Sequence, residues 1–336
     1  MAGIIFSRAS GVNESVFGLV QDPLEAFIER ENEAWMNKDM NLAPKIFHEF
    51  KMETATARIQ TMGSLGEMEV VGENGAYPIG EREEGFHKIF ETEEWKYSTG
   101  ISKTAMEDKL DFAVSSTGQD LVDSYHRTRN NFFWGLLGSA LQNKHYDRKG
   151  KIFSVNTMDG AKLFAAAHAS KFDKKLIQCN AFTDELSASN LGKLATKMQN
   201  FRNDNGEIIG LNPDTLIIPN TEEAKATAFG ILGSYNDPET PGGNRFNYLF
   251  GNWNVMVVPW LVGYMSGNKV PFIIMDSEYN KKRYGAVDAV RVAPEVSSYV
   301  DEGTDANIWK IRARFSGGFG EWRAFAAGGL EFGNTL

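Results

Sequence analysis

The sequence predicts a mixed α+β protein that is organised around one long helix. Residues 115–143 carry apolar side chains at helical spacing, and no proline interrupts them. Residues 63–106 are a glycine-punctuated, strongly acidic segment with β-like patterning. Short buried-strand patterns then alternate with helical stretches towards the end of the chain. A long helix beside extended segments is typical of an elongated subunit more than of a compact enzyme.

The long helix is predicted from Ser115 to Asn143, SSTGQDLVDSYHRTRNNFFWGLLGSALQN. Most of its apolar residues recur three or four positions apart, on one helix face: Leu121, Val122, Tyr125, Phe132, Phe133, Leu136, Leu137, Ala140 and Leu141. Ser116 and Gln119 have the spacing of a capping box. At 1.5 Å per residue such a helix is about 40 Å long. By itself, the pattern also fits a long helix in an ordinary α+β core.

Composition excludes several classes of protein. A chain of 336 residues exceeds one compact domain, so we expect one large domain or two intimately linked ones. The net charge of −9 argues against a dedicated nucleic-acid binder, which needs a basic surface. The single cysteine, Cys179, excludes an intramolecular disulfide framework and favours an intracellular, reducing setting. No signal-peptide pattern and no 18-residue apolar run occurs, which predicts neither secretion by that route nor membrane spanning.

The chain is predicted to begin with an arm at residues 1–21, followed by a short helix. Residues 1–21 are mixed in character and indicate a loosely held segment. Asp22-Pro23 then resembles a helix N-cap followed by proline at the first helical position. The apolar side of the short helix that follows would be lined by Leu24, Phe27, Ile28, Ala34 and Trp35.

Residues 63–106, here called the ribbon, are predicted to form a two-stranded hairpin. Glu73-Asn74-Gly75 is a strong tight-turn signal, and residues 86–101 suggest one long strand. Residues 67–94 contain nine glutamates against Arg82 and Lys88, which accounts for most of the net charge. An isolated hairpin is marginal in water, and this one has few apolar residues near its tip. It is therefore either a solvent-exposed hairpin or one that lies on a neighbouring subunit.

The remaining chain alternates short helices and strands. Helical patches are predicted at 163–170 and 186–190, and amphipathic helices at 191–202 and 222–232. Strands are predicted at 216–219, 254–259, 270–275 and 308–315, the last followed by a glycine-rich turn at 316–320. Residues 233–246 are rich in Gly, Pro, Asn and Asp, and have the length of a functional or mobile loop.

No catalytic or metal-binding motif is present. There is no HExxH, CxxC, GxxxxGK[ST] or helix-opening GxGxxG pattern, and the five histidines are scattered. His126 is predicted to be a partly exposed helix residue, and His168 a packed or capping one. Cys179 lacks the surroundings of a reactive thiolate. The ribbon glutamates could bind a divalent cation, but their pattern favours a solvated or intersubunit face. We therefore predict no catalytic residue, no cofactor and no metal.

Several stretches of the chain, taken in order, are similar to one known family. Before the long helix lies GFHKIFETEEWKYSTGISKTAMED. Further on come LFAAAHAS, LSASN and NFRNDNGEIIGLNPDTLIIPNTEEAKATAFGIL, and near the end RARFSGGFGEWRAFAAG. In this order, and over most of residues 45–327, they resemble the major capsid proteins of tailed bacteriophages, which have the Hong Kong 97-like capsid fold.

The resemblance implies a self-assembling, non-enzymatic subunit of an icosahedral head shell. It divides the chain into an N-terminal arm (1–62), an E-loop hairpin (63–106), a peripheral domain (107–206) with its spine helix (115–143), an axial domain (207–290) and return strands (291–336). The implied contact residues between subunits lie in the E-loop tip and the acidic ribbon: Glu73, Asn74, Gly75, Glu81, Glu83, Glu84, Glu93 and Glu94.

The resemblance also implies partners. Copies of the chain would form hexamers and pentamers in the virion, assembled in the host cytoplasm with a scaffolding protein, a portal and a decoration protein. The shell would enclose double-stranded DNA with at most weak contacts, for which Arg127 and Arg129 are candidates; helix-surface salt bridges are the equal alternative for both. No membrane is involved. The ribbon lysine that comes first in the sequence, Lys88, is not near the tip at Glu73-Gly75, so we predict no covalent cross-link there.

Two other functions stay open at this point. An encapsulin-type nanocompartment subunit shares the fold but encloses cargo enzymes. The ribbon-first order and the LFAAAHAS stretch favour the phage capsid. An oligomeric enzyme would need a pocket of converging reactive side chains, which no motif supplies.

Overall fold

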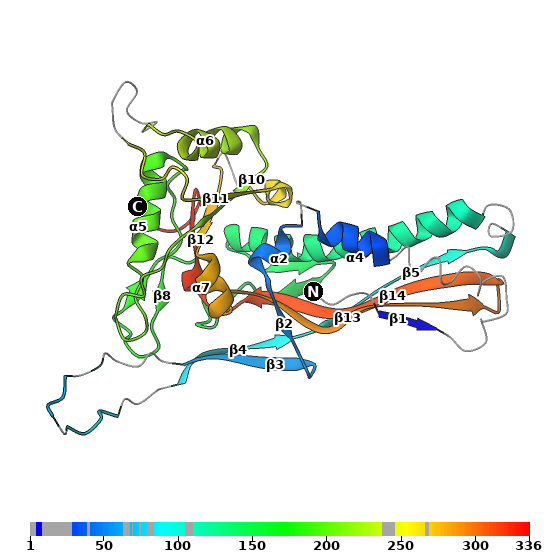
Figure 1. Ribbon diagram of the computed structural model, residues 1–336, viewed down its shortest axis with the longest axis horizontal. Coiled ribbons are helices and arrows are strands. Elements are labelled where there is room, and N and C mark those ends of the chain that lie inside the picture. The colour runs from blue at the N-terminus through cyan, green and yellow to red at the C-terminus, as the bar shows by residue number, and fades with distance from the viewer. Residues whose placement is uncertain are drawn as a thin grey trace. The chain divides into compact units, whose positions relative to one another are not determined.

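The computed structural model describes residues 5–8, 29–38, 41–62, 68, 70–73, 75–79, 84–104, 110–236, 246–265 and 269–336 (Figure 1). They divide into two compact units, each assembled from three stretches of the chain. The first unit contains residues 1–57, 90–133 and 288–317, and the second contains residues 58–89, 134–287 and 318–336.

The first unit is built on a five-stranded sheet. Its strands are β1 (Ile5–Arg8), β13 (Ala286–Asp301), β14 (Ala306–Phe319) and β5 (Glu93–Ile101) in that order, with β2 (His48–Lys51) also paired to β13. β1 runs parallel to β13, with Ile5 opposite Glu295. β5 runs antiparallel to β14, with Asn307 opposite Ile101. The prediction of a loosely held segment is therefore wrong at residues 5–8, and the rest of residues 1–21 lies outside the described residues.

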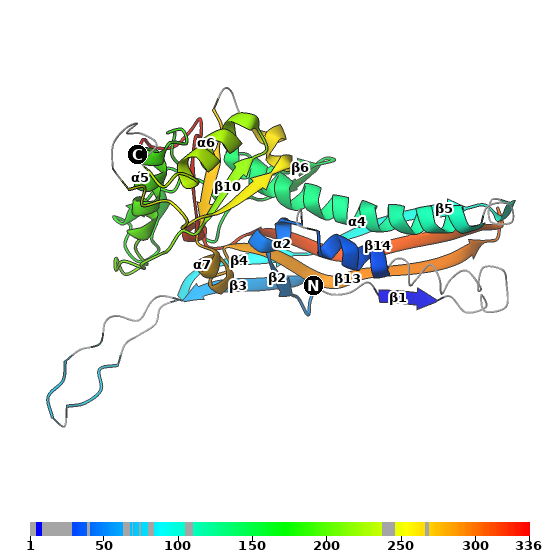
Figure 2. The ribbon, with the colours of Figure 1, turned by 45° about the horizontal axis from the view of Figure 1, so that its top comes forward.

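The long helix α4 (Leu110–Leu141) lies along this sheet in the first unit (Figure 2). The helix predicted at 115–143 is therefore present, and its predicted apolar residues from Leu121 onwards are buried except Tyr125, which is half-buried. The ring of Trp95 on β5 packs 5.5 Å from Phe132 and 5.1 Å from Phe315. The predicted capping box is wrong, because Ser116 lies inside the helix, which begins at Leu110.

Two short helical segments precede β2. Residues 29–36 are helical, and α2 (Ala43–Ile46) follows. Within the predicted short helix, Ala34 and Trp35 therefore lie in helical structure, whereas Asp22-Pro23, Leu24, Phe27 and Ile28 lie outside the described residues. Phe47, which ends α2, packs with its ring centroid 4.7 Å from that of Phe133 on α4.

The second unit contains a four-stranded mixed sheet. Its order is β11 (Asn254–Val258), β10 (Thr215–Pro219), β12 (Phe272–Met275) and β15 (Phe325–Gly328). β10 is buried throughout and runs parallel to β11 and antiparallel to β12. The helices and 3-10 helices of this unit are α5 (Ala188–Gln199), α6 (Glu222–Leu232), η1 (Pro259–Tyr264), α7 (Ser277–Lys282) and η2 (Trp322–Ala324).

The helix N-termini of this unit follow local capping rules. Thr221 caps α6 by accepting from the backbone of Ala224, as the predicted helix 222–232 requires. Ser187 caps α5 by accepting from the backbone of Asn190, so this helix begins before the predicted residue 191. The predicted helical patch at 186–190 is therefore the first turn of α5.

Three two-stranded pairs complete the fold. They are β3 (Thr56–Met62) with β4 (Glu84–Glu91), β6 (Tyr146–Arg148) with β7 (Lys151–Phe153), and β8 (His168–Ala169) with β9 (Ile177–Gln178). The predicted single strand at 86–101 is wrong, because β4 and β5 are separated at Thr92 and pair with different strands. Thr92 instead donates its backbone N–H to Ala55.

Two other predictions are wrong for identifiable reasons. Residues 163–170 are not helical, since Leu163 donates to the carbonyl of Val155 and Ala165 donates to the side chain of Asn180. Residues 316–319 belong to β14 rather than to a turn. A Cβ at Gly320 would collide with the carbonyl of Tyr284, so this glycine permits close backbone approach.

Candidate assembly surfaces

The base of the ribbon is secured by Lys88 on β4. Its ammonium donates to the carbonyl oxygens of Asn156 (2.5 Å) and Phe319 (3.0 Å). Burial lowers the pKa of Lys88 to about 8, because the charged form loses hydration. The side chain therefore points into its own unit.

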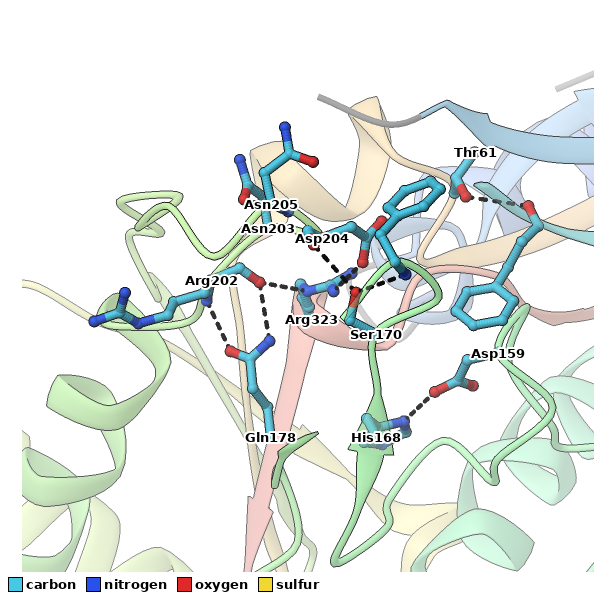
Figure 3. Close-up of polar contacts among 12 residues, drawn as sticks. Thr61, Asp159, His168, Ser170, Gln178, Arg202, Asn203, Asp204, Asn205 and Arg323 are labelled. Carbon is cyan, nitrogen blue, oxygen red and sulfur yellow. Dashed lines mark hydrogen bonds and ion pairs between the residues drawn. The ribbon is translucent and has the colours of Figure 1, made fainter. Parts of the chain in front are cut away.

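A second lysine holds the beginning of β4. Lys171 donates to the carbonyl oxygens of Glu84 (2.6 Å) and Gly85 (3.0 Å). Thr61 on β3 donates its hydroxyl to the carbonyl of Phe86 (3.1 Å), a contact drawn in Figure 3. A Cβ at Gly85 would collide with Thr61, so only glycine fits between the strands. The predicted contact residue Glu84 therefore has an anchored backbone and an exposed side chain.

The predicted turn of the ribbon is present. The backbone N–H of Gly75 donates to the carbonyl of Gly72 at 2.9 Å, which closes a four-residue turn. The predicted contact residues Glu73 and Gly75 are exposed there. Three further predicted contact residues lie outside the described residues: Asn74, Glu81 and Glu83. The turn places a carboxylate in solvent at the end of the hairpin.

Apolar side chains flank this turn and are exposed to solvent. They are Met68, Val70, Val71, Tyr77 and Ile79, of which only Val71 is less than nine-tenths exposed. The expectation of few apolar residues near the tip is therefore wrong. A cluster of exposed apolar side chains on a hairpin is typical of a surface that another molecule covers. The apolar residues are present in the sequence as MEVV (68–71) and YPI (77–79). They stand between glycines and glutamates, so the segment as a whole has an acidic composition.

The last two predicted contact residues belong to β5. Glu94 accepts from the guanidinium of Arg312 (2.5 Å) and lies 2.9 Å from the ammonium of Lys96. The hydrogen bond from Arg312 is the main cause that lowers the pKa of Glu94. Glu93 is half-buried. At solvent-exposed positions such pairs contribute little stability, but they show that Glu94 already has partners in its own sheet.

A groove of about 550 Å³ lies beside this pair on the sheet of the first unit. Its lining residues are Lys96, Tyr97, Ser98, Glu295, Ser297, Tyr299, Lys310, Ile311 and Arg312. The ammonium of Lys310 lies 5.1 Å from the centroid of the Tyr299 ring. The one lining carboxylate, Glu295, already lies 3.3 Å from Arg312. The groove thus offers exposed tyrosine rings and positive charge, which suits an acidic segment with apolar side chains.

The structure separates the two predicted arginines of the long helix. Arg127 is exposed. Arg129 is half-buried and donates to the carboxylate of Asp288, so it forms the salt bridge that was the alternative for this residue. His126, predicted as partly exposed, is 5% exposed, and its ring stacks on Trp35 with centroids 4.4 Å apart. The apolar periodicity of α4 did not reveal that His126 is buried, because Trp35 and Asn32, which cover it, lie elsewhere in the chain.

An aromatic patch in the second unit surrounds the ends of the predicted long loop. Tyr235 packs edge-on against Phe246 (5.1 Å) and Phe250 (5.9 Å), and all three are exposed. Tyr248 is exposed nearby in sequence, and its hydroxyl occupies the space above Gly192. Residues 237–245 of the loop lie outside the described residues.

A buried polar cluster in the same unit includes His168, which is packed as predicted. Arg323 donates to Asp204 (2.7 Å), Glu321 (2.9 Å) and the carbonyl of Arg202 (2.9 Å), as Figure 3 shows in part. Among the described residues, no group of three or more His, Cys, Asp or Glu side chains is arranged to hold a metal. None of the described helices combines the length and apolar character that crossing a bilayer needs.

The sequence matches a family described as phage capsid protein over residues 88–328. A comparison with curated proteins finds no match. Among solved structures, the capsid of Ralstonia phage GP4 is similar with a TM-score of 0.51 and 12% identity, covering 82% of this chain and 82% of that chain. At this identity the likeness concerns the fold alone.

Two further solved structures match this chain with TM-scores below 0.5. The structure from Microbacterium phage Oxtober96 has a TM-score of 0.47 and 11% identity, with 87% of this chain and 90% of that chain covered. The procapsid of bacteriophage JBD30 has a TM-score of 0.46 and 11% identity, with 94% of this chain and 76% of that chain covered.

Proposed function

The chain belongs to the phage capsid protein family, and from this premise we propose how copies of it hold one another in a shell. It is a structural, non-enzymatic subunit of the virion shell with a Hong Kong 97-like α+β fold. Copies of the chain associate with one another, because a shell is made of repeated subunits.

We propose that the tip of the ribbon of one subunit, around Glu73 and Gly75, lies in the basic groove on the sheet of a neighbouring subunit. The loop supplies exposed Met68, Tyr77 and Ile79 and the tip carboxylate of Glu73. The groove supplies the exposed rings of Tyr97 and Tyr299 and the ammonium of Lys310. Covering the apolar side chains provides the favourable free energy, and the charges set the register. The observation that carries the proposal is that exposed apolar side chains and a carboxylate on the tip match tyrosine rings and a lysine in the groove.

Each region implied by family membership has a proposed role in the contacts between subunits. The E-loop (63–106) reaches the neighbour, the spine helix (115–143) and return strands (291–336) form the peripheral domain, and residues 207–290 form an axial domain. In this arrangement the aromatic patch of Tyr235, Phe246 and Phe250 faces other copies around the axes of hexamers and pentamers. An arm at 1–62 adds further contacts.

A charge-exchange experiment tests the loop-to-groove contact. Glu73→Lys and Lys310→Glu each place like charges together in the contact, so each variant alone should lower the yield of shells. The double variant restores an opposite pair and should recover shells towards the wild-type yield. Shell yield is measured by sedimentation and electron microscopy, with circular dichroism to confirm folding.

A second experiment tests the apolar part of the contact. The double change Tyr77→Ser and Ile79→Ser should reduce shell formation strongly. The matched control, Ile152→Ser with Ile208→Ser, removes similarly exposed apolar side chains outside the ribbon and should assemble normally. An equal loss of shell yield in the two serine double variants would contradict this docking. So would a charge-exchange double variant whose loss of shell yield is the sum of the two single losses.

We also propose that proteins other than this chain take part in assembly. A scaffolding protein, a portal and a decoration protein would act during assembly in the host cytoplasm. The enclosed genome is double-stranded DNA, and the net charge of −9 limits its contacts with the shell. Exposed Arg127 is the candidate from the long helix, since Arg129 is paired. Family membership favours this function over a nanocompartment shell.

A further inference from the structure

The hairpin of β6 and β7 concentrates positive charge in a chain whose net charge is −9. With the two residues that lead into it, this basic hairpin spans residues 144–153. Against one carboxylate, that of Asp147, it carries four cationic side chains: Lys144, Arg148, Lys149 and Lys151. All three lysines are exposed, and Arg148 is half-buried. A fifth cation lies beside its start, because Lys162 donates its ammonium to the carbonyl of Asn143. The hairpin is therefore a local basic surface on an acidic protein.

The body of the basic hairpin is fixed to the end of α4. Tyr146 and Phe153 lie opposite each other in the strand register, are both 8% exposed, and pack with ring centroids 6.2 Å apart. A Cβ at Gly135 on α4 would collide with the Tyr146 ring, so the helix and the hairpin are in close contact. At the turn, the carboxylate of Asp147 accepts from the backbone N–H of Gly150 at 2.9 Å. The cations are thus carried on a defined support.

Several of these charges occupy positions where they cost local stability. Arg148 and Lys151 are directly opposite each other across the two strands, and like charges in such a pair are destabilising. Lys149 has φ 53° and Gly150 has φ 84°, so both central residues of the two-residue turn are left-handed. Turns of this kind favour Asn, Asp or Gly at the position of Lys149. The stability of the hairpin does not explain this choice of residues, which is typical of a binding surface.

We propose that the basic hairpin binds the phosphate backbone of the enclosed double-stranded DNA. The inference rests on the proposed function, because the shell is what brings DNA to this surface. Lysine ammonium groups are flexible point charges that neutralise phosphates and release condensed counterions. Phosphates carry no base sequence, so the contact suits a shell that holds every part of a genome. Each subunit contributes a few such contacts, and their repetition over the shell adds to the total binding.

The acidic ribbon of another copy is the competing occupant, and its chemistry fits the basic hairpin less well. The ribbon exposes apolar side chains beside its turn, among them Tyr77 and Ile79, and these need an apolar surface to cover them. The basic hairpin has one exposed large apolar side chain, Ile152. The groove of the first unit instead offers tyrosine rings. A hydrated phosphate backbone needs no apolar cover, so it matches the hairpin better.

Binding of the unassembled full chain to DNA tests the proposal, because the hairpin is then accessible. The probe is a fluorescein-labelled, mixed-sequence duplex, and binding is followed by fluorescence anisotropy over a series of salt concentrations. The triple variant Lys144→Gln, Lys149→Gln, Lys151→Gln should bind at least roughly tenfold more weakly than the wild type at about 50 mM salt. The slope of log K against log salt should fall by about 2–3, since each lost phosphate contact removes roughly 0.9.

A matched control separates the hairpin from the net charge. The variant Lys174→Gln, Lys193→Gln, Lys281→Gln removes three exposed lysines elsewhere, so its net charge equals that of the hairpin variant, and it should bind DNA like the wild type. An equal loss in both triple variants, or a wild-type chain that does not bind the duplex, would overturn the proposal. Lys151 lies 6.0 Å from the Phe153 ring centroid. If its loss unfolds the chain, Lys144→Gln with Lys149→Gln keeps that contact and should lower the salt slope by about 2.

Shell yield of the same variants separates this proposal from the proposed function. Neither triple variant changes the ribbon tip or the groove, so both should form shells like the wild type. Normal shells with unchanged DNA binding in the hairpin variant would overturn the role of the hairpin and leave the shell function standing. A hairpin variant that loses shells but keeps its DNA binding would show a contact between copies, which would also overturn the proposal.

Discussion

The guanidinium of Arg129 on α4 pairs with the buried carboxylate of Asp288 on β13, and the same guanidinium lies over three aromatic rings. Those rings are Tyr125, Phe133 and Phe315, at 5.5 to 5.8 Å from their centroids. Burial raises the pKa of Asp288 to about 6, although Arg129 partly opposes this effect. The long helix is thus joined to the sheet of the first unit by a pair that is sensitive to pH.

The first prediction concerns the titration of Asp288. Its native pKa lies above the ordinary value, so its stabilising contribution is full below about pH 4 and is lost as the pH rises through about 6. Relative to Asp288→Asn, the wild type should therefore lose stability between pH 4 and 7, by on the order of 3 kcal/mol. Urea unfolding of the purified chain measures this difference. A difference that is independent of pH, or that grows in favour of the wild type, would count against the raised pKa.

The second prediction concerns His126, for which the free energy of unfolding is expected to fall as the pH falls, opposite to Asp288. Burial first, and then Arg129 and Lys38, lower the pKa of His126 to about 3. Below about pH 6.5, His126 binds a proton in the unfolded chain but not in the native state, so stability is lost as the pH falls. His126→Phe keeps a ring beside Trp35 but cannot titrate, and should lose less stability than the wild type from pH 7 to 4.5. Exposed His145→Phe is the control and should follow the wild type.

The third prediction concerns Lys88 at the base of the ribbon. Its pKa of about 8 lies below that of lysine in an unfolded chain, near 10.4, so the native state gains stability as the pH rises between these values. The wild type should therefore gain stability relative to Lys88→Met between pH 7.5 and 10. Lys193→Met, at an exposed position, should show no such trend. Parallel curves for all three proteins would exclude a buried ammonium at Lys88.

The fourth prediction concerns packing at α4. A Cβ at Gly138 would collide with the ring of Tyr264, so Gly138→Ala should destabilise the fold by about 1–3 kcal/mol. Gly230 on α6 has open space above it, so Gly230→Ala should instead stabilise by roughly 0.5–1 kcal/mol. Thermal unfolding midpoints of the two variants should move in opposite directions. A neutral Gly138→Ala would show that Tyr264 moves aside without loss.

Local patterns were enough to predict several elements. The helix predicted at 115–143, observed at 110–141, follows from apolar residues spaced three or four apart, and α6 follows from the alanines of its helical stretch. The turn that Gly72 and Gly75 close follows from its Glu-Asn-Gly signal. Each of these depends on residues within a few positions of one another, so a single stretch of sequence contains the whole cause.

Other features depend on distant segments, and the sequence did not reveal them. β4 and β5 are adjacent in the chain, but one pairs with β3 and the other with β14. Residues 163–170 have the composition of a helix, but Asn180 and Val155 bind their backbone groups instead. Likewise, Trp35 and Asn32 cover His126, which the periodicity of its own helix could not indicate.

The sequence by itself determined that this protein is an α+β shell subunit with a long helix, an acidic ribbon and no catalytic motif. Only the tertiary structure decided which distant polar groups pair away from solvent, namely Arg129 with Asp288 and His168 with Asp159. It also revealed the exposed apolar side chains beside the ribbon's turn. The physical reason is that periodicity and capping act over a few residues, whereas burial and protonation depend on what packs against a side chain from elsewhere in the chain.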